Sequence, residues 1–255
     1  MAKVLDNVRK LYLEGIRDGN ARSAVQKYTG DRYTQHSTGV ADGVEGFLAF
    51  FEPFVARNPD REIEIIRFIE DGQYVFCHAY QSLNGGSAKW VTTDLFDSDT
   101  NGLIVEHWDA ISPYQDVTLS GEDMVAGPNE IIDLDKTNYN KAQVHEFVKQ
   151  ILQEKQFHLI DQFCADTCVT HFPKAKAGKE GLVSWFQSDE FGQYDMLFKL
   201  VGEGNFVATI GKTYAQGKEN ISFHIYRLEQ GLIVECWDNV EAIAPRDQWN
   251  NSGKF

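Results

Sequence analysis

Two aspartates end nearly identical octapeptides, GLIVEHWD at residues 102–109 and GLIVECWD at residues 231–238. Each octapeptide is largely apolar before its acidic end, which is typical of a strand that enters a core. A carboxyl group at the rim of an apolar enclosure has a raised pKa, because desolvation disfavours its charged form. Asp109 and Asp238 are therefore candidate general acids or bases near neutral pH. A strand-end aspartate can equally be a turn cap, and that structural interpretation stays open.

Two further pairs of titratable residues recur near these aspartates. Counting back from the glycine that opens each octapeptide places Asp94 and His224 at equivalent positions of the preceding strand. His36 and His171 occupy short extended segments, YTQHS and CVTHF, and could complete each cluster. A carboxylate beside an imidazole or a second carboxyl can remove and return a proton, so these six residues are the candidate catalytic groups. A single histidine of this kind is also commonly a hydrogen-bonded structural residue.

Strand alternation selects the residues that could contact a substrate. Alternate side chains of a strand share a face, so the odd-numbered residues of 103–109 should point one way with Asp109, and the even-numbered ones the other way. In the second octapeptide the even-numbered residues Leu232, Val234 and Cys236 should likewise share a face with Asp238. His78, which the second repeat replaces with Ile210, could line a pocket in the first repeat alone. The candidate substrate-binding residues are His78, His107, Trp108, Trp237 and Cys236.

The octapeptides belong to a longer internal repeat. YTQHSTGVADGVEGFLAFF, from Tyr33, is matched in register by CVTHFPKAKAGKEGLVSWF, from Cys168. DGQYVFCHAY, from Asp71, is matched by EGNFVATIGK, from Glu203, as an apolar strand opened by an acid-Gly turn. Three matches in the same order indicate two diverged copies of one domain rather than a solenoid.

The periodicity of each copy predicts helices first and strands afterwards. Apolar residues at helical spacing lie near 8–16 and 144–151, and shorter helical stretches lie near 24–28 and 159–163. A Gly-introduced helix is expected near 44–54 and 179–185. Strands are expected at 62–69, 73–81, 89–96 and 103–111, with counterparts up to residue 243. This order predicts an α+β fold for each copy.

The segment between the copies is acidic, contains Gly127-Pro128 and lacks sustained periodicity. We therefore predict a first domain over residues 1–117, a linker over residues 118–138 and a second domain over residues 139–255.

Composition excludes several classes of function. A formal net charge of −14 opposes binding to nucleic acid, whose affinity for proteins comes largely from Lys and Arg. No apolar run approaches the roughly 20 residues that span a bilayer, and the N-terminal segment lacks the apolar core of a signal peptide, so a cytoplasmic protein without membrane contact is expected. Four cysteines do not resemble a disulfide framework, and the spacing of Cys164, Cys168 and His171 is a poor match to a zinc site, so no metal is expected.

The histidine-bearing segment, the G-x-E-G helix start and the strand ending in GLIVEHWD together resemble the SnoaL-like polyketide cyclase branch of the nuclear transport factor 2-like superfamily. The resemblance covers nearly all of each copy except the linker. It implies two tandem cone-shaped domains, each with about three N-terminal helices packed in a curved antiparallel sheet. Such cones pair sheet to sheet, which implies an intramolecular pseudo-dimer with Trp108 and Trp237 at the internal interface, and a further homodimer is compatible with it.

The resemblance also implies a reaction. SnoaL-like cyclases use an aspartate at the end of the last long strand as acid and base in an intramolecular aldol condensation, with a histidine about fourteen positions earlier. Asp238 and His224 match that pair, whereas the first copy has Asp109 with Asp94 in place of the histidine. Two nearby carboxyls would titrate as a coupled pair, so the first copy could do different chemistry or only bind.

The implied mechanism needs no cofactor, and the implied substrate is a small, largely apolar carbonyl compound. Cyclisation, isomerisation and epoxide hydrolysis all suit a carboxylate in an apolar cone. Two other classes of function stay open. One is a non-catalytic small-molecule-binding or protein-association module. The other is a structural interaction domain whose cones are filled by their own aromatic side chains, for which the 17 phenylalanines would suffice.

Overall fold

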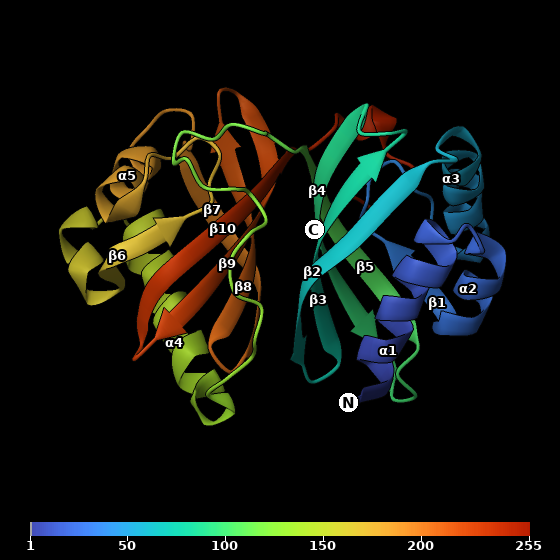
Figure 1. The fold of residues 1–255 in the computed structure, drawn as a ribbon, viewed down its shortest axis with the longest axis horizontal. Coiled ribbons are helices and arrows are strands. Elements are labelled where there is room, and N and C mark those ends of the chain that lie inside the picture. The colour runs from blue at the N-terminus through green and yellow to red at the C-terminus, as the bar shows by residue number, and fades with distance from the viewer. Residues whose placement is uncertain (1) are drawn as a thin grey trace. The chain divides into compact units, whose positions relative to one another are not determined.

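The computed structural model describes residues 2–255, which divide into two compact units (Figure 1). The first domain contains the chain up to Pro113 together with Ile243–Phe255, and the second domain contains Tyr114–Ala242. The predicted boundaries differ from this division. The segment between the sheets packs with the second domain rather than serving as a free linker, and the residues that follow the last strand pack with the first domain.

The first domain opens with helices, as its sequence predicts. Their apolar stripe, which contains Val8, Leu11 and Ile16, is buried in the core. Fully burying each such aliphatic side chain stabilises the fold by about 1.5–3 kcal/mol. These elements are α1 (Ala2–Lys10), which continues into the π-helical turns of η1 (Leu11–Arg17), then α2 (Ala21–Tyr28), β1 (Thr29–Gln35) and α3 (Gly43–Arg57).

A curved sheet completes the first domain. Its long strands are β2 (Arg61–Asp71), β3 (Tyr74–Leu83), β4 (Ala88–Ser98) and β5 (Ile104–Pro113). The strand order is β1-β5-β4-β3-β2; β1 runs parallel to β5 and the other neighbours are antiparallel. The helices cover one face of this sheet (Figure 1), and the core lies between them.

The second domain repeats this topology, with the strand order β6-β10-β9-β8-β7. Within residues 2–255 the chain therefore forms two five-stranded sheets in tandem, which confirms the predicted α+β duplication. A short 3₁₀ helix, η4, stands where the first domain has α2. The elements are η2 (Leu134–Lys136), α4 (Thr137–Phe147), η3 (Val148–Gln153), η4 (Phe157–Gln162), β6 (Cys164–Thr170), α5 (Gly178–Phe186), β7 (Gln193–Glu203), β8 (Phe206–Ala215), β9 (Lys218–Glu229) and β10 (Leu232–Ala242).

The repeated G-x-E-G motif has a structural cause. Gly43 begins α3 with a φ of 79°, in the left-handed region that favours glycine. At Gly46 a Cβ atom would lie 2.0 Å from the carbonyl oxygen of Ala41, so no larger residue fits without moving the backbone. Gly178 and Gly181 repeat both features at the start of α5. The motif sets the entry of the helix rather than contributing chemistry.

A β-bulge corrects the predicted alternation of the octapeptide strand. Ile104 pairs with Ser98 and Glu106 pairs with Asp97, so Val105 is an extra residue between them. An extra residue reverses the faces on one side of the bulge. Ile104 therefore enters the helix-side core, with His107 and Asp109 further along the same face, whereas Leu103 and Val105 were predicted there. The second domain has the same register shift, between Ile233 and Glu235 of β10.

Across the residues that the structure describes, no helix is both long and apolar enough to cross a bilayer.

Candidate active site

A cavity of about 380 Å³ lies in the first domain, between the helices and the concave face of the sheet. This volume is within the usual range of ligand pockets, about 300–1,000 Å³. Aromatic rings of α3 line one wall, namely Phe47, Phe50, Phe51 and Phe54. Polar side chains lie among the apolar ones, and include Tyr12, Gln35, Ser37, Asp94, His107 and Asp109. An apolar enclosure with a few convergent polar groups is the usual form of a small-molecule site.

Asp94 and Asp109 lie directly opposite each other on β4 and β5. Both are buried, with 5% and 4% of their surface exposed. Directly opposed residues of an antiparallel pair have Cβ atoms about 5 Å apart, so the two carboxyl groups lie close enough to influence each other. The structure thus brings together in the cavity the two aspartates that the sequence placed on neighbouring strands.

Asp94 is held by two donors on different elements. Its Oδ1 lies 2.9 Å from Nε2 of His107, and Tyr12 donates a hydrogen bond of 2.7 Å to its Oδ2. His107 Nδ1 lies 2.9 Å from Gln35 Oε1, which can only accept, so Nδ1 carries a proton and Nε2 faces Asp94. Burial raises the pKa of Asp94, and His107 opposes this rise only in part. Because a 2.9 Å contact between an imidazole nitrogen and a carboxyl oxygen needs a hydrogen atom, one proton lies between Asp94 and His107.

The pKa of Asp109 is shifted in the opposite direction to that of Asp94. Burial raises its pKa, but Lys254, assisted by His107 and Ser37, lowers it below the usual value for an aspartate. Lys254 Nζ donates a bond of 2.7 Å to Oδ1 of Asp109 and one of 2.9 Å to its backbone oxygen. Asp109 is consequently a carboxylate at neutral pH. Two carboxyl groups whose surroundings push their pKa values apart form a natural acid and base pair.

His36 does not join this cluster, and its predicted place beside Asp109 is corrected. Its ring stacks on Trp108 with centroids 4.7 Å apart, and its Nε2 lies 2.9 Å from Glu106 Oε1. Its Nδ1 donates to the backbone oxygen of Gly253 at 2.6 Å. Trp108 and Glu106 have the strand parity opposite to Asp109, so this group lies on the other face of the sheet. Trp108 is likewise absent from the cavity wall.

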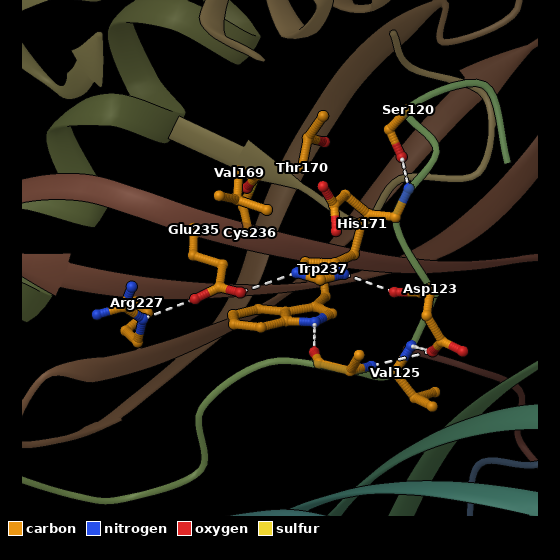
Figure 2. Close-up of polar contacts among 12 residues, drawn as sticks. Ser120, Asp123, Val125, Val169, Thr170, His171, Arg227, Glu235, Cys236 and Trp237 are labelled. Atoms are coloured by element: carbon orange, nitrogen blue, oxygen red, sulfur yellow. Dashed lines mark hydrogen bonds and ion pairs between the residues drawn. The ribbon is translucent and has the colours of Figure 1, made fainter. Parts of the chain in front are cut away.

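His171 makes the equivalent contacts in the second domain. Figure 2 shows its ring over Trp237, with centroids 4.8 Å apart, between Glu235 and Asp123. Its Nε2 lies 2.9 Å from Glu235 Oε1, and its Nδ1 donates to the backbone oxygen of Asp123. Trp237 donates to the backbone oxygen of Ala126 at 2.8 Å. The repeated His, Glu and Trp thus form a structural stack that each domain uses to hold an irregular segment of chain.

His78 is also placed on the face away from the cavity. Its neighbours Cys77 and Ala79 belong to the helix-side core, so His78 points the other way, where its Nδ1 lies 3.1 Å from Arg67. Its predicted contact with a substrate in the cavity is therefore wrong. Of the five predicted substrate-binding residues, His107 alone lines the cavity.

The interior of the second domain is filled at the equivalent position. Asp238 and His224 are directly opposite on β10 and β9, as Asp109 and Asp94 are in the first domain. His224 is fully buried, stacks on Phe172 with centroids 5.4 Å apart and shares a hydrogen bond of 3.1 Å with the hydroxyl of Tyr226. Burial lowers the pKa of His224 to about 3, so its ring is neutral. Cys236, at the position of His107, is part of the apolar core.

One substitution explains much of the difference between the two interiors. Ser37 follows His36 and lines the cavity, whereas Phe172 follows His171 and is fully buried. The Phe172 ring packs on Phe186 with centroids 6.1 Å apart and occupies space beside the opposed pair of β9 and β10. The prediction of aromatic-filled cones thus applies to the surroundings of His224, and the prediction of an open apolar pocket applies to the first domain.

Sequence reasoning missed four residues of the first-domain site, namely Tyr12, Gln35, Ser37 and Lys254. Tyr12 lies within the apolar helical stretch near residues 8–16, and the available signal is a hydroxyl group within a buried stripe. Ser37 could have been noticed from its replacement by Phe172 in the second copy. No local pattern marks Lys254, because it lies 145 residues from its partner.

Among residues 2–255, no cluster of His, Cys, Asp and Glu is suited to hold a metal ion. All four cysteines are buried and free.

Asp238 provides a prediction for stability. Its Oδ1 is buried without a hydrogen-bond partner in the described chain, and burial raises its pKa from 3.8 to about 7. Between these values the folded chain keeps a proton that the unfolded chain has lost, so stability falls as pH rises through this window. We expect Asp238→Asn to stabilise the second domain by roughly 1–3 kcal/mol at pH 8, because its side chain still has partial contact with solvent, and by little at pH 4.

Calorimetric unfolding from pH 4 to pH 8 measures this effect. Asp195→Asn, at an exposed position, is the matched control and should leave the pH dependence unchanged. If the free energy of unfolding depends on pH in the same way in the native chain and in Asp238→Asn, the pKa of Asp238 is not raised by folding.

One comparison with known proteins, the family match, falls within the first domain. Residues 8–107 match the family of the SnoaL-like domain. No curated protein matches the chain. Solved structures that are similar in part include a provisionally named polyketide cyclase from Bacillus cereus, at 15% identity over 43% of this chain and 74% of that chain, with a TM-score of 0.39. TsrD from Streptomyces laurentii has 16% identity over 44% and 89%, with a TM-score of 0.38.

Proposed function

We propose that the first domain, of which residues 8–107 match the family of the SnoaL-like domain, binds a small, largely apolar carbonyl compound and transfers a proton at the carbon next to its carbonyl group. The observation that carries this proposal is the opposed pair of Asp109, a carboxylate, and Asp94, which shares a proton with His107, in one apolar cavity. The cavity wall supplies both the base and the acid for such a step, without a cofactor.

The proposed reaction begins with Asp109. Its carboxylate removes the proton from the α carbon, and the electron pair of the broken C–H bond moves to the carbonyl oxygen to form an enolate. The Asp94–His107 pair donates its proton to that oxygen. The enol then returns its O–H proton to the Asp94–His107 pair as it reacts. Either its α carbon attacks a second carbonyl of the same molecule, whose oxygen takes the proton from Asp109, which closes a ring, or a conjugated γ carbon takes that proton, which isomerises the substrate. Exclusion of water by the aromatic wall strengthens each of these polar contacts.

The second domain has a different role in this proposal. Its interior beside His224 is filled by Phe172, so we assign ligand binding to the first domain and a supporting role to the second. The alternative function, a non-catalytic small-molecule-binding module, uses the same cavity. It differs in having no proton transfer at Asp109.

The far end of the cavity suggests one feature of the substrate. Arg57 lines the cavity at the end of α3, with its guanidinium 5.5 Å from the centre of the Phe54 ring and 6.0 Å from that of Phe50. No carboxylate forms an ion pair with Arg57 among residues 2–255. We expect Arg57→Gln to weaken binding of ketones that carry a carboxylate by about fivefold, roughly 1 kcal/mol for a partly exposed charge pair, and to leave neutral ketones unaffected.

Matched pairs of aryl ketones with and without a carboxylate, titrated by calorimetry, provide the measurement. Arg22→Gln, on the neighbouring helix α2 and outside the cavity wall, is the control. If Arg57→Gln lowers the affinity for ketones with and without a carboxylate equally, Arg57 does not have the proposed role.

The proposed function is tested by following proton transfer directly. A panel of apolar aromatic and alicyclic ketones is first screened for thermal stabilisation of the chain, because a ligand that binds the folded state raises its stability by mass action. Each compound that binds is then incubated with the protein in D₂O, and loss of the α-proton signal is followed by NMR. Exchange faster than the buffer reaction supports proton abstraction, whereas tight binding without exchange supports the binding module.

A further inference from the structure

The segment Ile243–Phe255, here called the returning segment, packs against the wall of the first-domain cavity. The backbone N–H of Asn250 donates to the oxygen of Thr38 at 2.9 Å. The side chain of Asn251 donates to the backbone oxygens of Ser37 and Val40, at 2.6 and 2.8 Å. Ser37 and Val40 line the cavity, so the returning segment holds part of its wall in place.

The returning segment also inserts a lysine into the first domain. Lys254 is 1% exposed, and its Nζ contacts both the carboxylate and the backbone oxygen of Asp109, at 2.7 and 2.9 Å. A buried ammonium group without a partner would carry a desolvation penalty of several kcal/mol. The two contacts with Asp109 offset this penalty and fix the direction of the carboxylate through one oxygen.

Asp238 shows the same strand position without such a lysine. It lies opposite His224 as Asp109 lies opposite Asp94. Burial raises the pKa of Asp238 to about 7, whereas the pKa of Asp109 is lowered. The segment that packs against the second domain contributes backbone oxygens of Asp123 and Ala126, but no side chain that pairs with Asp238.

We propose that Lys254 is a positioning residue of the first-domain site, which orients Asp109 and keeps it ionised, so that this site is completed by a segment that follows the second domain in the sequence. The effect of Lys254 on the charge of Asp109 does not depend on any reaction. Its effect on turnover rests on the proposed function.

Other groups also face Asp109 and are part of the expected titration. Asp94 on β4 opposes its ionisation, while His107 on β5 and the hydroxyl of Ser37 favour it. Tyr33 on β1 also interacts with Asp109, and burial keeps the pKa of Tyr33 above its usual value, so it is neutral. The ring of His107 faces Asp94 rather than Asp109. The positive charge that contacts Asp109 directly is therefore that of Lys254.

The test is a side-chain carboxyl NMR titration of the full chain, with the Asp109 signal assigned from its loss in Asp109→Asn. We expect the native Asp109 to titrate below the usual aspartate range. Lys254→Met, which keeps length and apolar volume, should raise its midpoint by at least one to two pH units, and Lys254→Arg should restore a low midpoint. Lys174→Met removes a lysine that acts on Asp238 and is the matched control, for which Asp109 should be unchanged.

Each outcome decides the proposal. A midpoint that does not move in a folded Lys254→Met overturns it. If that variant does not fold, a native midpoint within or above the usual aspartate range overturns the proposal, and a native midpoint below that range supports it. Where the ketone panel shows exchange, the acid limb of the pH profile should move upward in Lys254→Met with the NMR midpoint. A shifted midpoint in a chain that never exchanges protons would contradict the proposed function and leave the role of Lys254 intact.

Discussion

Asp109→Asn is expected to reduce α-proton exchange by about 10³-fold while leaving the affinity for the same ketone within a few-fold of the native value. An amide has nearly the shape of a carboxylate, so the cavity is preserved, but it cannot accept the proton. Exchange measured by NMR in D₂O and affinity measured by calorimetry separate the two effects.

This substitution leaves the ammonium group of Lys254 buried without its partner, which can cost about 3–5 kcal/mol of stability. The double variant Asp109→Asn with Lys254→Met removes both charges and tests the same step in a more stable background. Asp238→Asn is the matched control, because it makes the same chemical change at the equivalent strand position of the second domain. Loss of exchange in Asp238→Asn and its survival in Asp109→Asn would move the site to the second domain.

Ser37→Phe should abolish ligand binding, with affinity falling by about 100-fold or more. A phenyl group here copies the second domain, where Phe172 fills the space beside His224. Burying the ring fills apolar volume but can also strain the wall, so the change in stability should stay within about 3 kcal/mol. Calorimetric titration with any ketone that binds the native chain provides the measurement.

Two companion variants make this result specific. Ser37→Ala removes the hydroxyl without adding volume and should keep binding within a few-fold. Phe172→Ser removes a fully buried ring and should destabilise the second domain by about 3–5 kcal/mol, because the surrounding core relaxes only in part. Unchanged affinity in Ser37→Phe would show that ligands bind elsewhere.

The fold was predictable because it depends on patterns that repeat. Helical spacing, β-branched runs and the paired glycines of α3 and α5 each have a local cause, and each occurs twice. The placement of Asp94 and Asp109 on neighbouring strands followed from counting along each repeat, whereas their direct opposition depends on the hairpin register. These features need only short stretches of sequence.

The remaining features of the site depend on local irregularity or on distant residues. The bulge at Val105 reverses the side-chain alternation, and nothing in GLIVEHWD distinguishes a bulged strand from a regular one. His36 resembled a catalytic residue by type and spacing, although its partners Glu106 and Trp108 make it structural. Lys254 required knowledge of where the chain goes after β10. No periodic pattern in the sequence links two charged residues that are so far apart along the chain.

The discontinuity of the first domain has a consequence for its biosynthesis. Lys254 is synthesised 145 residues after Asp109, which corresponds to roughly 7–30 s at ordinary rates of translation. During that interval Asp109 of the nascent first domain has no ammonium partner. In this respect it resembles Asp238, which has no paired lysine among the described residues of the folded chain. Asp109 therefore gains its ammonium partner only after residue 254 has left the ribosome, and a chain that stops before this residue has the pocket without Lys254.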